Sequence, residues 1–157
     1  MARVTKTTKS RSVAETCRFA AALGRSAKTG SIIELIGGLG SGKTVFARAF
    51  AHAFGVRGRI VSPTFVLTSR YHVSTKKALY HVDCYRLGRL SKNDAGFLTE
   101  LLNEKSAVVL VEWADRITAL LKCISRSRRT TITFIVTGAR TRTLVIQGAL
   151  SRAAPMR

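Results

Sequence analysis

Eight consecutive residues carry the strongest chemical signal in the chain. Residues 37–44 read Gly-Gly-Leu-Gly-Ser-Gly-Lys-Thr and match the pattern G-x-x-x-x-G-K-[ST] at every fixed position. Glycines in such a loop let successive backbone N–H groups turn toward one point and bind phosphate oxygens, while the lysine reaches the terminal phosphates and the threonine hydroxyl reaches Mg²⁺. The nucleotide-binding residues predicted here are Gly37, Gly38, Leu39, Gly40, Ser41, Gly42, Lys43 and Thr44.

A phosphate-binding loop of this kind works with a carboxylate that binds the metal or orients the attacking water. Glu112 directly follows the apolar run 108–111, and Asp83 ends a second strand-like run, 78–82. Because ligands bind at the carboxyl ends of the strands in an α/β sheet, both are candidate catalytic residues, and Glu112 with Thr44 forms the candidate metal site. A structural ion pair with one of the many arginines is the alternative for each carboxylate.

The segments around the loop have the patterns needed to position it. Residues 31–36 form a short apolar run, and Phe46, Phe50 and Phe54 recur at helical spacing after the loop. Ser12-x-x-Glu15 has the spacing of a capping box and predicts a helix to about residue 23. We also predict helices over 91–103 and 117–123, a hairpin of strands 65–73 and 78–84, a strand over 107–111, and two closing strands over 130–136 and 142–147.

Alternating strands and helices predict an α/β fold. We expect a single P-loop NTPase domain with three layers, α/β/α, around a mixed, mostly parallel sheet that includes an antiparallel hairpin. The domain is expected over residues 12–150, between a flexible basic N-terminus, 1–11, and a flexible C-terminal tail, 151–157.

Composition limits the function classes further. The 157 residues contain 27 Lys and Arg against 8 Asp and Glu, a net charge of +19. Residues 1–30 carry +6, residues 31–115 carry +4 and residues 116–157 carry +9, so most of the excess lies outside the loop region and indicates nucleic-acid binding only weakly. Without a run of about 20 apolar residues or a signal-peptide pattern, and with three widely spaced cysteines, the sequence predicts a cytoplasmic protein that does not contact membranes.

Four motifs, in this order, resemble the TsaE family, also called YjeE. They are residues 37–44, Ser62-Pro63-Thr64-Phe65, His81-x-Asp83-x-Tyr85-Arg86-Leu87 and Val111-Glu112-Trp113, and together they cover about residues 31–117. Gly38 departs from the family pattern, which usually has an acidic residue there, and Ala114 departs from the usual Pro or Ser. Gly38 lies within the loop but leaves its backbone N–H groups in place, and Ala114 lies outside the predicted phosphate- and metal-binding residues.

The resemblance implies an ATPase that uses Mg²⁺ and is required, with the TsaD and TsaB proteins, to form the threonylcarbamoyl group on adenosine 37 of tRNAs reading codons that begin with adenine. It implies weak hydrolysis alone, modulation by the partners, and contact with tRNA through that complex. Thr64 would face the γ-phosphate, Asp83 would lie near the metal or the attacking water, and Trp113 would lie next to the nucleotide.

The residues alone leave several alternatives open. A small-molecule kinase would also use a phosphate-binding loop, and a nucleotide-switched RNA-binding protein would fit the net charge. Thr64 is also a common turn residue, Trp113 is also a common core residue, and Arg86 fits either a phosphate contact or an ion pair.

Overall fold

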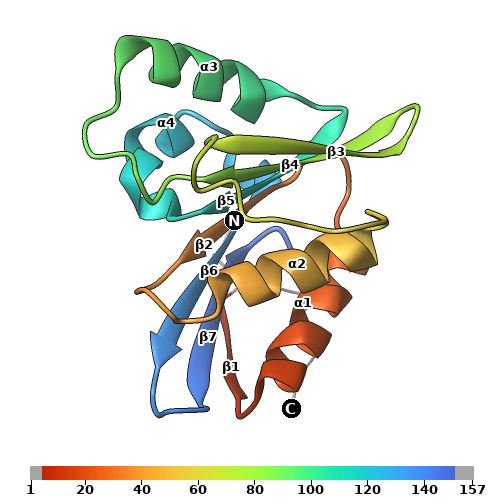
Figure 1. Ribbon diagram of the computed structural model, residues 1–157, viewed down its shortest axis with the longest axis vertical. Coiled ribbons are helices and arrows are strands. Elements are labelled where there is room, and N and C mark those ends of the chain that lie inside the picture. The colour runs from red at the N-terminus through yellow and green to blue at the C-terminus, as the bar shows by residue number, and fades with distance from the viewer. Residues whose placement is uncertain (1–4, 151–157) are drawn as a thin grey trace.

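A seven-stranded sheet runs through the protein, with helices on both of its faces (Figure 1). The computed structural model describes residues 5–150. The strands are β1 Thr5–Ser10, β2 Ile32–Ile36, β3 Thr68–Ser74, β4 Lys77–Asp83, β5 Ala107–Glu112, β6 Arg129–Val136 and β7 Arg142–Gly148. The helices are α1 Val13–Ser26, α2 Lys43–Phe54, α3 Lys92–Asn103 and α4 Thr118–Lys122, with short 3₁₀ turns η1 Ala114–Ile117 and η2 Arg126–Arg128. Within this part of the chain no helix combines the length and apolarity that crossing a membrane requires.

The strand order β1-β7-β6-β2-β5-β4-β3 places β2 and its phosphate-binding loop at the centre of the sheet. The inner pairings β6–β2, β2–β5 and β5–β4 are parallel, and the outer pairings β1–β7, β7–β6 and β4–β3 are antiparallel. The α/β class, the mixed sheet and the hairpin are thus confirmed, with the six pairings divided evenly rather than mostly parallel. Because β2, β5 and β4 run the same way, their carboxyl ends meet at one edge.

Each face of the sheet is covered by its own helices and has its own apolar core. Phe46, Phe50 and Phe54 of α2 are buried against one face, as their spacing predicts, together with α1. The two helices approach closely at Gly24, where a Cβ would lie 2.4 Å from the Phe50 carbonyl oxygen. Leu98 and other apolar side chains of α3, with Leu121 of α4, cover the opposite face.

The N-terminal segment corrects one expectation. Thr5–Ser10 is an edge strand that pairs antiparallel with β7, from Thr5 opposite Gln147 to Ser10 opposite Arg142, so these residues belong to the sheet. The signal was weak because its period-two alternation is one of exposed and half-buried polar side chains rather than of polar and apolar ones. Residues 1–4 and the predicted tail 151–157 lie outside the described residues.

Half of the predicted capping box forms at the start of α1. Ser12 Oγ accepts a hydrogen bond from the Glu15 N–H at 3.1 Å, and Glu15 Oε2 accepts one from the Arg11 N–H at 2.9 Å. The first bond satisfies an N–H group of the first helical turn that has no partner within the helix. The second is made to Arg11, whereas a complete capping box would direct Glu15 to the N–H of the N-cap residue, Ser12.

Glu34, the polar interruption in the apolar strand β2, has a structural role. Its buried carboxylate accepts from the Arg129 guanidinium at both oxygens, with Nη2 to Oε2 at 3.1 Å, and from Thr131 Oγ1 at 2.9 Å. Arg129 and Thr131 belong to β6, so these contacts tie the two central parallel strands together.

We expect Arg129→Met to lower the free energy of unfolding by about 3–5 kcal/mol, because it leaves the Glu34 carboxylate buried without its cation. Urea unfolding would measure the loss. The matched control is Arg18→Met, which removes an arginine from the more exposed pair with Glu15 and should cost no more than about 1 kcal/mol. Equal effects of the two substitutions would contradict a stabilising role for the buried pair.

Candidate functional site

The phosphate-binding loop connects the end of β2 to the start of α2, as the sequence predicts. Gly42 has φ of 104° and Gly40 has φ of 71°, a left-handed backbone that glycine adopts without strain. Gly42 is the N-cap residue of α2, and no side chain caps that helix. The N–H groups of its first turn therefore have no partner within the helix and are available to an anion.

Two polar side chains lie buried within the loop. Within residues 5–150, Ser41 Oγ has no hydrogen-bond partner. Lys43, only 4% exposed, directs its Nζ to the carbonyl oxygens of Gly37 at 2.7 Å and Gly38 at 2.8 Å. A buried hydroxyl without a partner and an ammonium at the centre of the loop fit a ligand rich in oxygen acceptors. The loop therefore fits the phosphates that its sequence predicts.

Burial lowers the pKa of the Lys43 ammonium, and the negative charges of Glu112, Asp115 and Asp83 oppose this effect. These carboxylates lie on the side of the loop that faces β4 and β5. Trp113 lies on the same side, with its ring centroid 3.7 Å from Lys43 Nζ, close enough for a cation–π interaction.

Glu112 is buried at the end of β5, and each of its carboxylate oxygens has a partner. Thr44 Oγ1 donates to Oε2 at 2.8 Å, and His81 Nε2 lies 2.9 Å from Oε1. An ionised carboxylate only accepts hydrogen bonds, so His81 is its donor through Nε2. The structure thus brings the two predicted metal ligands, Thr44 and Glu112, together.

Asp83 is the register partner of Glu112 on the neighbouring strand β4. Its Oδ2 accepts hydrogen bonds from Ser62 Oγ at 2.9 Å and Thr64 Oγ1 at 2.6 Å, and its Oδ1 accepts one from the Tyr85 N–H at 2.9 Å. Two hydroxyls of the 62–64 loop are therefore fixed to a buried carboxylate. Thr64 is therefore a hydrogen-bond donor to Asp83 as well as a residue of the turn.

Trp113 and Arg86 complete the predicted set. Trp113 is half-buried with φ of 57°, a left-handed backbone that is uncommon outside glycine, and its ring packs 5.1 Å from that of Tyr85. The Arg86 guanidinium lies 4.2 Å from the ring centroid of Phe65, so it meets an aromatic face rather than a carboxylate. Leu39, at the tip of the loop, is 81% exposed.

One member of the site was quoted in a motif but given no role by sequence reasoning. His81 is two residues before Asp83 on β4, so the two side chains lie on the same face of the strand. That spacing would have placed His81 near Asp83. Its hydrogen bond to Glu112 depends on the pairing of β4 with β5, which the sequence does not show.

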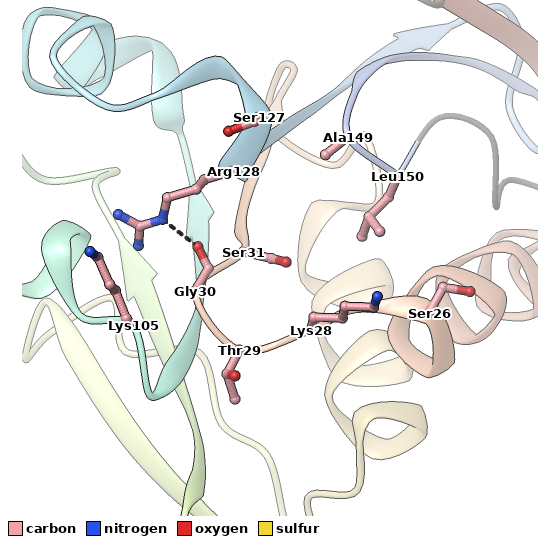
Figure 2. Close-up of a pocket in the computed structure, with 10 residues that line it drawn as sticks. All are labelled: Ser26, Lys28, Thr29, Gly30, Ser31, Lys105, Ser127, Arg128, Ala149 and Leu150. Atoms are coloured by element: carbon pink, nitrogen blue, oxygen red, sulfur yellow. Dashed lines mark hydrogen bonds between the residues drawn. The ribbon is translucent and has the colours of Figure 1, made fainter.

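A hollow of about 470 Å³ lies at the opposite edge of the sheet from the phosphate-binding loop, where β2 begins (Figure 2). None of the predicted site residues lines it. Arg128 crosses it with Nε donating to the Gly30 carbonyl at 2.6 Å and Nη2 donating to the Leu102 and Glu104 carbonyls at 3.0 Å each. These bonds fasten η2 to the segments before β2 and β5.

A strand, a glycine-rich loop with Lys43 and Thr44, and carboxylates at the ends of two neighbouring parallel strands define a P-loop nucleotide-binding protein. A family profile described as "Threonylcarbamoyl adenosine biosynthesis protein TsaE" matches residues 10–144. The chain belongs to the TsaE family.

Individual relatives agree with this assignment. The chain is 36% identical over 113 residues to the tRNA threonylcarbamoyladenosine biosynthesis protein TsaE of Treponema pallidum. The aligned region covers 71% of the chain and 81% of that protein. The chain is 41% identical over 112 residues to the protein of the same name from Mycobacterium tuberculosis H37Rv, covering 66% of the chain and 65% of that protein. Among solved structures it is similar to Bacillus subtilis YdiB, with a TM-score of 0.72 and 27% identity over 98% of this chain and 91% of that one.

We expect Asp83→Asn to loosen the 61–67 loop. Hydrogen bonds to a charged acceptor contribute about 1.5–3 kcal/mol each, and the amide offers the hydroxyls of Ser62 and Thr64 only a neutral acceptor. Hydrogen exchange at the Val66 amide, which donates to the Pro63 carbonyl, should become faster. Glu100→Gln on the exposed face of α3 is the control, and unchanged Val66 exchange in Asp83→Asn would show that Asp83 does not hold the loop.

Proposed function

We propose that the chain is a cytoplasmic, Mg²⁺-dependent ATP-binding and ATP-hydrolysing subunit that acts with TsaD and TsaB. Together they would form the threonylcarbamoyl group on adenosine 37 of tRNAs that read codons beginning with adenine. The observation that carries the proposal is the contact of Thr44, next to Lys43 at the start of α2, with the Glu112 carboxylate at the end of β5. Membership of the TsaE family supports a role in tRNA threonylcarbamoyladenosine biosynthesis and the choice of ATP.

The loop residues 37–44 would bind the ATP phosphates through their backbone N–H groups and the start of α2. Lys43 Nζ would exchange its bonds to the Gly37 and Gly38 carbonyls for phosphate oxygens. Its charge is held close to the loop because the side chain is buried and lies against Trp113. Trp113 would therefore adjoin the nucleotide.

Thr44 and Glu112 would hold Mg²⁺, which binds through one or two protein groups together with substrate phosphates. When bound, the metal supplies positive charge at the phosphate oxygens. His81 holds the second oxygen of Glu112, so the carboxylate keeps one orientation while Oε2 is directed at Thr44.

Asp83 and Thr64 would act on the attacking water. The Thr64 hydroxyl donates to Asp83 Oδ2, and the carboxylate is buried beside Glu112 rather than paired with a cation. A carboxylate held in this way can orient a water and accept its proton. In this assignment Glu112 serves the metal and Asp83 the water.

Three substitutions separate these roles. We expect Lys43→Ala to abolish measurable ATP binding, because it removes the cation buried in the loop. Glu112→Gln should keep nucleotide binding but raise the Mg²⁺ concentration needed for turnover, whereas Asp83→Asn should lower turnover about 100-fold with little change in that requirement. Emission of Trp113, the only tryptophan, reports binding, and phosphate release reports turnover.

Lys76→Ala, in the exposed turn between β3 and β4, is the control for all three. Full turnover in Glu112→Gln without added Mg²⁺ would contradict the metal assignment. Release of less phosphate than ADP would point to transfer onto an acceptor, as in a kinase.

Partner dependence tests the pathway. In a mixture of TsaD, TsaB, tRNA and the threonylcarbamoyl donor, we expect the wild-type chain to support modification of adenosine 37 and Lys43→Ala to fail. ATP turnover by the wild-type chain should rise when TsaD and TsaB are added, because partner groups complete many P-loop sites. Stimulation by tRNA alone would instead indicate a nucleotide-switched RNA-binding protein.

A further inference from the structure

Arg142, the first residue of β7, is a buried arginine that has no acidic partner among residues 5–150. The residue is only 9% exposed, and none of the ion pairs formed within residues 5–150 includes it. Nη1 donates to Thr16 Oγ1 at 3.2 Å, while Nε is buried and has no hydrogen-bond partner in the described part of the chain. Burying a charge is costly unless it is paired, so this guanidinium needs an explanation.

The position of Arg142 supplies one. It is paired with Val136 at the end of β6, so it lies at the edge where β2 leads into the phosphate-binding loop. A Cβ built on Gly42 would lie 3.8 Å from Cζ, Nε and Nη1 of Arg142 alike, so the flat face of the guanidinium lies beside the loop. Gly42 directly precedes Lys43 and begins α2.

A chain of hydroxyls holds the guanidinium in this place. Thr16 Oγ1, which accepts from Arg142, is also 2.8 Å from Ser10 Oγ, and Ser10 Oγ donates to the Ser12 carbonyl at 2.9 Å. Ser10 ends β1 and Thr16 lies in the first turn of α1, so both come from the N-terminal part of the fold. These neutral groups position the positive charge without neutralising it.

We propose that Arg142 is a second nucleotide-binding cation, which attracts the nucleotide phosphates from the side of the loop opposite the carboxylates. The proposal rests on the function proposed above. Lys43 lies toward Glu112, Asp83 and Asp115, whose charges act on it, whereas no carboxylate of the described chain lies within 4.0 Å of the Arg142 nitrogens. A guanidinium stays charged at any physiological pH, so its attraction is permanent.

The test measures the nucleotide affinity of the Arg142→Met variant from the fluorescence emission of Trp113. Methionine removes the positive charge but keeps much of the length of the aliphatic side chain. Affinity for ATP and ADP should fall about tenfold or more, affinity for AMP should fall less, and affinity for adenosine should stay within about twofold. The loss should shrink as salt is added, because salt screens charge attraction. Arg142→Lys should retain most of the wild-type affinity.

Arg57→Met is the matched control, since it removes an exposed arginine beyond the far end of α2, about 18 Å from the loop, and should leave all four affinities unchanged. Thr16→Val tests the position of the guanidinium independently of its charge, because this substitution removes a hydrogen-bond partner of Arg142 but keeps the cation. It should cost less ATP affinity than Arg142→Met. Thermal unfolding without nucleotide shows whether each variant is folded.

Three results would overturn the proposal: ATP affinity in Arg142→Met within twofold of wild type, an equal loss for adenosine and ATP, or a loss independent of salt. If Arg142→Met does not fold, a loss in Arg142→Lys equal to that in Thr16→Val, without salt dependence, would assign Arg142 a structural role only. A wild-type chain that binds no nucleotide would instead refute the proposed function itself.

Discussion

The buried carboxylate of Glu112 needs a hydrogen-bond partner at each oxygen, because an unsatisfied buried charge costs several kcal/mol. Thr44 and His81 supply these partners from α2 and β4, so one side chain of β5 fixes the start of the helix and the neighbouring strand relative to each other. The next residue, Trp113, leaves the strand with a left-handed backbone and lies over Lys43. The arrangement of the loop, the helix and both strands thus depends on this carboxylate.

The parts of the fold that could be predicted are those with a local pattern. The strand before the loop, the loop itself and the phenylalanine face of α2 depend on residues close in sequence, and the structure has all three. The strand ending at Glu112 was readable for the same reason. For Glu34 the sequence shows only a polar residue within an apolar run and does not indicate its partners. Arg129 and Thr131 are about 95 residues away and contact it through the pairing of β2 with β6.

The parts that could not be predicted depend on pairing between distant segments. β1 pairs with β7, which joins residues near the two ends of the chain, and its own residues are polar on both faces. The same pairing adds an antiparallel edge, which is why the sheet is evenly mixed. It also brings Ser10 and Thr16 to Arg142, so the polar contacts beside the loop follow from a strand that the sequence signals only faintly.

The net charge of +19 says less about function than the placement of the few buried charges. Glu34, in the middle of β2, is neutralised by Arg129. At the ligand edge Lys43 and Arg142 are buried and form no salt bridge with a carboxylate of residues 5–150. Glu112 and Asp83 bond to His81 and to hydroxyls there instead of to Lys or Arg. Charges of both signs are therefore held close together but not paired. A ligand that combines phosphates with a divalent metal satisfies both sets, since phosphates bind the cations and the metal binds carboxylate oxygen.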